Sequence, residues 1–212
     1  QSEVINLVEG AIDSEDKCRI AALPDGGFVV IWLGGDGKGS LALWGQKFDA
    51  GCSKTGSPFP VTTLAGQVIM FPEVSVLAGG GFVVVWARTA YGSNQGRVYA
   101  RLFDYQCAPL TDELTVSGET GGYSQPDVTG LSGGGFMVVW EAGSLDDAAM
   151  DIFARKYDVF GQATGDQFKV NTDTQNFHLF PSLAPRGEDG ALVVWQSGSP
   201  DTLLFNIMGR LY

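Results

Sequence analysis

One apolar pattern recurs four times along the chain. Each copy begins at a glycine, continues with apolar residues and ends on a tryptophan; the four runs are Gly27–Trp32, Gly81–Trp86, Gly135–Trp140 and Gly190–Trp195. The tryptophans are 54, 54 and 55 residues apart. Runs of this length that are rich in valine and aromatic residues are typical of buried strands. The pattern therefore predicts the same strand four times.

Three further strands are predicted at nearly constant offsets from each tryptophan. The strand before it (126–131 in the third copy) begins at or next to one of four equivalent positions, Cys18, Pro72, Pro126 and Pro181. The strand after it ends at Phe48, Phe103, Tyr157 or Tyr212, and a short last strand covers 59–61, 114–116 and 168–170. Asp25-Gly26, Gly79-Gly80 and Gly133-Gly134 are expected to form tight hairpin turns, because such turns need the positive φ that glycine adopts easily. Each copy is thus a unit of four antiparallel strands.

Repeats of about 54 residues are typical of arrays, solenoids and propellers. The segment around Ile5 favours a propeller, because it lies 13 residues before Cys18, as Phe59 lies before Pro72. It resembles the last strand of a unit, which the fourth copy lacks. Pairing it with the strand that ends at Tyr212 would close a ring and leave no open edge.

We therefore predict an all-β fold, a four-bladed β-propeller of four-stranded antiparallel blades. It forms one domain over 1–212, with repeats at about 9–62, 63–117, 118–171 and 172–212 plus 1–8. The alternative is an eight-bladed ring made by a dimer that exchanges its first strands. Closure within one chain is preferred because it costs less entropy.

Composition and charge agree with an all-β protein and exclude some partners. The chain has 30 glycines and 11% aromatic residues, and its net charge is -11. A surface this acidic repels phosphate backbones, so we expect no nucleic-acid partner. The apolar runs are too short for a membrane span. Because the chain begins at Gln1, we also expect a mature segment that has lost its targeting peptide, and hence a secreted or cell-surface location.

Three cysteines allow at most one disulfide within the chain. Cys52 and Cys107 occupy the same loop in adjacent copies, and the sequence leaves open whether they are bridged or free.

The third copy resembles a known tandem repeat. Its Gly133–Trp140 core and its Phe168–Thr172 ending are similar to repeats of very large secreted bacterial proteins of the RTX and adhesin types. This resemblance implies export, a propeller-like fold and a surface or adhesive role rather than a reaction. The first copy departs from the pattern at Cys18, and the fourth copy replaces the Gly-Gly turn with the longer segment 186–190.

Residues typical of catalysis are sparse. His178 is the only histidine, no nucleophile motif accompanies it, and we expect it to be exposed or to pack within a loop. No cysteine or histidine spacing indicates zinc. The repeated tryptophans are expected in the core. Arg101, Arg155 and Arg210 occupy the same position in the last three copies, and we expect them to join neighbouring blades, with Asp104 and Asp158 as partners.

Two regions are candidate sites. If the first strand of each copy is innermost, Arg19, Glu73, Asp127 and Ser182 ring the channel mouth. There Glu73 and Asp127 are candidate metal ligands for Ca²⁺ or Na⁺, unless Arg19 neutralises them. The variable loops and one unmatched tryptophan supply the candidate ligand-binding residues: Asp36, Trp44, Tyr91, Asn94, Asp146, Asp147 and Asp201.

Together these features predict a non-enzymatic extracellular module for binding or assembly. Its partner would be a glycan, through direct or calcium-bridged contacts, or a protein surface, including other copies in a homo-oligomer or a larger extracellular assembly. The alternative is a small polysaccharide-active hydrolase or lyase that uses the channel-mouth carboxylates Glu73 and Asp127.

Overall fold

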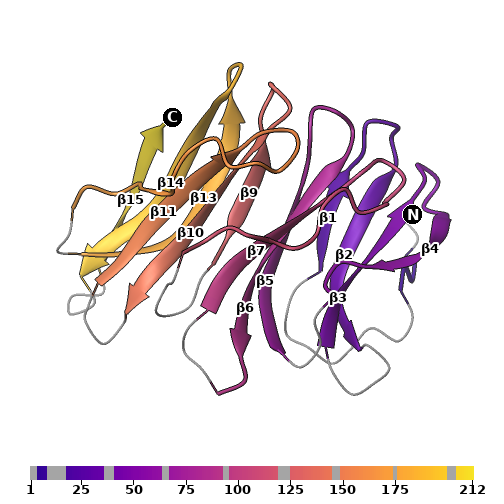
Figure 1. Cartoon of the computed structure of the whole chain (residues 1–212), viewed down its shortest axis with the longest axis horizontal. Helices are drawn as coiled ribbons and strands as arrows, with labels where there is room; N and C mark the ends of the chain where they lie inside the picture. Colours follow the sequence, from indigo (N-terminus) through magenta and orange to yellow (C-terminus); the bar gives the residue numbers. More distant parts are fainter. Residues whose placement is uncertain are drawn as a thin grey trace.

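The computed structural model describes residues 4–8, 18–35, 41–63, 67–92, 96–118, 125–144, 149–173, 176–199 and 204–212. All regular elements in these ranges are β-strands (Figure 1). None of the described residues forms a helix able to cross a bilayer.

The strands form four antiparallel sheets, one from each repeat. Sheet I contains β1 (Arg19–Ala22), β2 (Phe28–Gly35), β3 (Leu41–Phe48) and β4 (Lys54–Pro60). Sheet II contains β5 (Gln67–Val76), β6 (Phe82–Ala90), β7 (Gly96–Phe103) and β8 (Leu114–Thr115). Sheet III contains β9 (Asp127–Gly130), β10 (Phe136–Ser144), β11 (Ala149–Tyr157) and β12 (Phe168–Lys169). Sheet IV contains β13 (Phe177–Arg186), β14 (Gly190–Ser199) and β15 (Leu204–Leu211). The predicted strand order within each repeat is confirmed.

The hairpins between the first two strands follow the glycine pattern. Gly26, Gly80 and Gly134 have φ values of 83°, 90° and 95°, in the region that other residues rarely adopt. In sheet IV the longer turn has Gly187 at φ 64°. A glycine with positive φ is therefore present in each of the three turns that the sequence predicts, in sheets I, II and III.

The core consists of three apolar clusters, each between two consecutive sheets. The tryptophans that end the apolar runs of sheets II, III and IV are buried in them, as predicted: Trp86, Trp140 and Trp195. Trp32 of sheet I is half-buried. The sheets are thus held together mainly by stacking apolar faces, and the fold depends on each sheet having a neighbour.

The repeated arginines add a polar fastening between sheets. Arg101 Nη1 donates to the carbonyl oxygen of Val61 in the preceding repeat at 3.0 Å. Arg210 Nη1 donates to Val170 in the same way at 2.6 Å, and Arg155 Nη1 reaches the carbonyl oxygen of the equivalent residue, Val116, at 3.5 Å.

The predicted connection between blades is confirmed, but the predicted partners are wrong. Asp104 Oδ1 instead accepts hydrogen bonds from the backbone N–H groups of Gln106 and Ala108. Asp158 closes its own loop in the same manner. A short aspartate side chain reaches the amides of its own turn more easily than a neighbouring sheet.

The four sheets do not close into a ring. β15 has one strand neighbour, β14, and residues 4–8 adopt no strand conformation. Residues 4–8 lie beside sheet I and the C-terminus lies beside sheet IV, at opposite ends of the molecule (Figure 1). Leu7 and Val8 line a cavity of about 300 Å³ with Trp32 and Gln46 of sheet I.

The closure predicted for Ile5 and Tyr212 is therefore wrong for the single chain. The physical reason is that the last strand of a repeat is also held by the sheet that follows it, as Val61 is held by Arg101. For residues 4–8, the following sheet is sheet I.

Candidate functional site at the channel mouth

The first strands of all four sheets meet around one cavity. Its volume is about 590 Å³, within the range typical of small-molecule sites. It is lined by Arg19, Phe71, Pro72, Glu73, Gln125, Pro126, Asp127, Phe180, Pro181 and Ser182. The four residues that the sequence assigns to the channel mouth, one from each repeat, thus lie on the walls of a single cavity.

Two bulges shape the wall of this cavity. The register of β5 against β6 shifts between Met70 and Glu73, and the register of β13 against β14 shifts at the equivalent place. At the bulges Phe71 and Phe180 have φ values of 52° and 54°, which are unusual for bulky residues. Such a conformation costs about 1–3 kcal/mol and persists only where the surrounding structure holds it, as at many functional sites.

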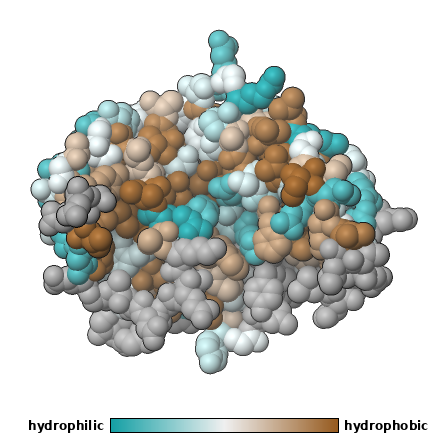
Figure 2. Space-filling view, turned by 180° about the vertical axis from the view of Figure 1, so that it is seen from behind, coloured by the Kyte–Doolittle hydropathy of each residue, from teal (hydrophilic) through white to brown (hydrophobic). Residues whose placement is uncertain are grey.

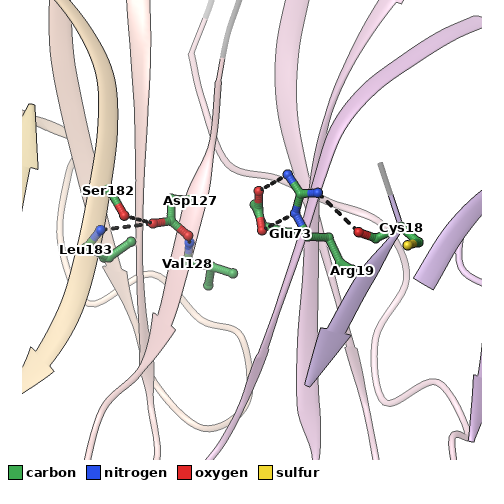
Figure 3. A network of polar contacts seen from close by, with 7 residues as sticks. All are labelled: Cys18, Arg19, Glu73, Asp127, Val128, Ser182 and Leu183. Atoms are coloured by element: carbon green, nitrogen blue, oxygen red, sulfur yellow. Dashed lines mark hydrogen bonds and ion pairs between the residues drawn. The ribbon is translucent and has the colours of Figure 1, made fainter. Parts of the chain in front are cut away.

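Arg19 and Glu73 form a two-pronged ion pair on one side of the cavity (Figure 3). Arg19 Nε donates to Glu73 Oε2 at 2.7 Å, and Nη2 lies 2.6 Å from Oε1. Arg19 Nη1 also donates to the Cys18 carbonyl oxygen. Paired guanidinium and carboxylate groups in this geometry orient one another strongly. Both oxygens of Glu73 are therefore occupied by Arg19.

Asp127 is held by the next sheet (Figure 3). Its Oδ2 accepts hydrogen bonds from Ser182 Oγ at 2.8 Å and from Leu183 N at 3.0 Å. Its Oδ1 accepts one from Val128 N at 2.8 Å. These donors fix the carboxylate at the point where sheets III and IV meet.

The metal site predicted at Glu73 and Asp127 is not supported by a ligand cluster. Among the described residues there is no group of three or more His, Cys, Asp or Glu side chains placed to hold an ion. Arg19 binds Glu73, while Asp127 faces Ser182, so the two carboxylates are engaged separately (Figure 3).

Sequence reasoning missed Glu141, which lies just behind the cavity wall. It is 3% exposed, and its Oε2 accepts a hydrogen bond at 3.1 Å from the N–H of Phe180, at the bulge in β13. Burial raises the pKa of Glu141 to about 7. The signal was available: Glu141 is an acidic residue directly after the tryptophan of a buried run, where the other repeats have Leu33, Ala87 and Gln196.

His178 is not the exposed or loop residue that the sequence suggests. It lies buried on β13. Its Nδ1 accepts a hydrogen bond from Trp195 Nε1 at 3.1 Å, and its Nε2 lies 3.0 Å from the carbonyl oxygen of Asp173. A carbonyl oxygen only accepts, so Nε2 carries the proton and the ring is neutral. Burial lowers the pKa of His178, which agrees with a structural role.

Few of the predicted ligand-binding residues can be placed. Trp44 is half-buried and pairs across the strands with Trp32, beside the smaller cavity near residues 4–8. Tyr91 is exposed at the end of β6. The remaining predicted residues lie outside the described ranges: Asp36, Asn94, Asp146, Asp147 and Asp201.

The three cysteines are free thiols. Cys18 is exposed, while Cys52 and Cys107 are half-buried in their turns. Burial raises the pKa of Cys107 to about 11, which makes it a poor nucleophile at neutral pH.

The sequence matches no protein-family model and no curated protein. The fold, however, is shared with solved structures. The GH43 endo-arabinanase from Bacillus licheniformis aligns with a TM-score of 0.54 and 14% identity, over 92% of this chain and 70% of that one. An endo-arabinase from Bacteroides thetaiotaomicron aligns with a TM-score of 0.50 and 12% identity, over 91% and 73%. A protein of unknown function from Dyadobacter fermentans aligns with a TM-score of 0.61 and 14% identity, over 91% and 51%. These likenesses support the β-propeller type of fold.

The comparison corrects the prediction of a non-enzymatic, adhesive module, since the structures that share this fold include glycoside hydrolases. The physical reason for the error is the kind of chemistry that was sought. Sparse histidines, nucleophile motifs and metal ligands do not exclude glycoside hydrolysis, which needs only a pair of carboxyl groups. The channel mouth carries such groups on neighbouring sheets.

Proposed function

We propose that the chain is a polysaccharide-cleaving hydrolase whose reaction takes place in the channel-mouth cavity. The observation that carries this proposal is a cavity of about 590 Å³ with Glu73 and Asp127 on its walls and with Glu141 hydrogen-bonded to Phe180 of the wall. The shared fold with proteins named as endo-arabinanases makes arabinan the first substrate to test. Hydrolysis transfers a proton to the leaving glycosidic oxygen and adds water oxygen to the anomeric carbon.

In this proposal Asp127 assists the attack on the anomeric carbon. It only accepts hydrogen bonds, from Ser182, Leu183 and Val128, so its lone pairs rather than a proton are available to the substrate. Two of its donors are backbone N–H groups, which cannot turn away. This fixed orientation is what a catalytic base or nucleophile requires.

Glu141 is the proposed proton donor. A carboxyl group with a pKa of about 7 stays partly protonated at neutral pH and can release its proton to a leaving oxygen. Glu73 is unsuited to this role, because Arg19 occupies both of its oxygens. The Arg19–Glu73 pair is instead proposed to bind sugar hydroxyl groups and to set the charge of the cavity.

The experiment measures reducing ends released from arabinan and from a panel of other polysaccharides. Asp127→Asn and Glu141→Gln should each lower the rate by at least about a hundredfold. Asp166→Asn and Glu188→Gln are matched controls, since both side chains are exposed and outside the cavity. Wild-type protein that is folded but releases no product from any substrate would overturn the proposal.

The pH profile tests the role of Glu141. Its acid form is lost as the pH rises through about 7, so activity should fall above that pH. Glutamine can still accept the hydrogen bond from Phe180, so Glu141→Gln should fold normally and lose this alkaline limb together with the activity. A limb that persists unchanged in Glu141→Gln would assign the proton donor elsewhere.

We also propose that the four sheets are part of a complete propeller ring. Support comes from the free edge of β15 and from the positions of sheets I and IV at opposite ends of the molecule (Figure 1). A closed ring would wall the cavity on its open side and keep bulk water from the reacting groups.

A further inference from the structure

Sheet IV has an outer face that is apolar and uncovered. Ile207 of β15 is 73% exposed, whereas the equivalent residues Val98 and Ile152 are 0% exposed. Leu192 and Leu211 are exposed in the same way, although Val83 and Leu102 of sheet II at these positions are buried. In the reverse view, brown apolar surface reaches the side of the molecule where sheet IV lies (Figure 2). An apolar sheet face with a free edge strand is typical of an interaction surface.

Within the chain, the same face is covered each time by the front face of the next sheet. Val98 and Leu102 of sheet II pack in one cluster with Phe136, Val138 and Trp140 of sheet III. The last strand of the repeat covers the remaining edge, since the Val116 backbone N–H donates to Val98 O at 2.9 Å.

Sheet I has the matching front face. Phe28, Val30 and Trp32 occupy the positions of Phe136, Val138 and Trp140. Phe28 and Trp32 are only half-buried. Residues 4–8 lie beside this face, where Leu7 shares a cavity with Trp32 and Gln46. Gln46 takes the position of Arg101, the residue that binds the last strand of the preceding repeat. Sheet I together with residues 4–8 thus resembles the surface with which sheet III covers sheet II and sheet IV covers sheet III.

We propose that sheet IV of one copy docks on sheet I of a second copy, and that residues 4–8 of the second copy pair with β15. The single chain does not make this contact with itself, because its two ends lie far apart (Figure 1). The interface joins two different surfaces, and two such contacts close a ring of eight sheets. This docking specifies how the ring proposed above would close, and it does not require that the chain be an enzyme.

The three complete sheets predict the register of the added strand. Gly45 pairs with Phe59, Ala100 with Leu114 and Ala154 with Phe168. By the same offset, Gly209 should pair with Ile5 of the second copy. The N–H of Leu7 should then donate to Ile207 O, as Val61 N donates to Leu43 O at 2.8 Å and Val170 N to Ile152 O at 2.7 Å.

One hydrogen bond of the repeat is missing from this pairing. Leu43 N donates to Thr62 Oγ1 at 3.1 Å, Val98 N to Ser117 Oγ at 3.0 Å and Ile152 N to Asn171 Oδ1 at 2.9 Å. Val8 holds the equivalent position and offers no acceptor. Val8→Thr should restore the hydrogen bond to Ile207 N and lower the dimer dissociation constant about fivefold. The methyl group that valine has at this place cannot accept a hydrogen bond.

The first experiment measures mass in solution over a range of concentrations. The wild type should weigh twice the 22.5 kDa of the chain. Ile207→Glu should shift it to the monomer, because a buried carboxylate without a partner is costly. Phe160→Glu is the control, since Phe160 is equally exposed but lies in a turn of sheet III. A wild-type monomer at all concentrations would overturn the proposal, as would equal effects of the two substitutions.

The second experiment tests the register by cross-linking. Ile5→Cys and Gly209→Cys are combined in a chain whose three native cysteines are replaced by serine. A Cβ at Gly209 meets nothing closer than 3.5 Å, so the substitution fits. We expect a disulfide between two copies. Asn6→Cys with Gly209→Cys is the control, because a shift of one residue turns the side chain to the other face. A disulfide within one copy, or none, would contradict the docking.

Discussion

Two arginine–glutamate pairs among the described residues differ in their surroundings: one is buried between β6 and the loop before β8, and the other lies at the channel mouth. Arg88 and Glu113 are 6% and 8% exposed, whereas Arg19 and Glu73 are 25% and 26% exposed. Arg88 also lies 3.7 Å from the centre of the Tyr99 ring, and Glu113 accepts two hydrogen bonds from Thr63. The buried pair therefore joins three segments of the protein, while the mouth pair joins two first strands beside a cavity.

This contrast separates structural from functional use of the same chemistry. A buried pair is costly to form but very costly to break, because the surviving charge has lost both water and partner. A partly exposed pair contributes little to stability, because water and salt screen it. Its presence at a cavity is therefore better explained by what it can bind or orient.

Breaking the buried pair should give the largest effect. Arg88→Met leaves Glu113 charged and buried, and it should lower the free energy of unfolding by about 3–5 kcal/mol. Denaturation in urea measures this. The double variant Arg88→Met with Glu113→Gln should recover most of the loss, because no uncompensated charge remains. A loss below about 1 kcal/mol in the single variant would show that the pair behaves like a surface pair.

The second largest effect is expected at acid pH, where the Arg88–Glu113 pair should contribute less to the free energy of unfolding. Burial alone would raise the pKa of Glu113, but hydrogen bonds from Thr63 and Arg88 outweigh it and hold the pKa below its ordinary 4.5. The folded state therefore binds this proton less readily, and the stability it contributes is present above pH 4.5 and is lost as the pH falls through the lower folded value. The difference in unfolding free energy between wild type and the Arg88→Met, Glu113→Gln double variant should shrink over that range. A difference that stays constant would contradict the shift.

The smallest effect on stability is expected at the channel mouth. Arg19→Met should change the free energy of unfolding by less than about 1 kcal/mol, since the pair is partly exposed. The same variant should lower hydrolysis at least about tenfold, because Glu73 loses the group that orients it. Urea denaturation and the reducing-end assay are read on one preparation. Equal losses of stability at Arg19 and Arg88 would abolish the distinction between the two pairs.

Periodicity predicted the features that depend on local sequence. The tryptophan runs located the strands of each repeat, and alternation along the first strand placed Arg19, Glu73, Asp127 and Ser182 at one channel mouth. The turn glycines followed from their need for positive φ. Such features recur because each repeat packs equivalent faces against its neighbours.

Features that depend on a single repeat were not predictable in this way. Among the described residues, Phe71 and Phe180 lie at bulges in the first strands of sheets II and IV, and Glu141 accepts a hydrogen bond from the backbone N–H of Phe180. Arg88 and Glu113 are 25 residues apart and meet only after β6 and the loop before β8 have folded. The prediction of ring closure was wrong for a related reason. Equivalent strands indicate that two surfaces are compatible, but they do not show whether the two surfaces meet within one chain or between two chains.

The backward reach of the arginines has a consequence for how such a chain grows. Arg101 and Arg210 each hold a carbonyl group that belongs to the repeat before their own. A duplicated repeat therefore carries the arginine that binds the repeat before it. No further substitution is needed to form this hydrogen bond. The first repeat differs: Gln46 stands in place of the arginine, and its amide donates to carbonyl groups of its own repeat, Lys47, Thr55 and Gly56.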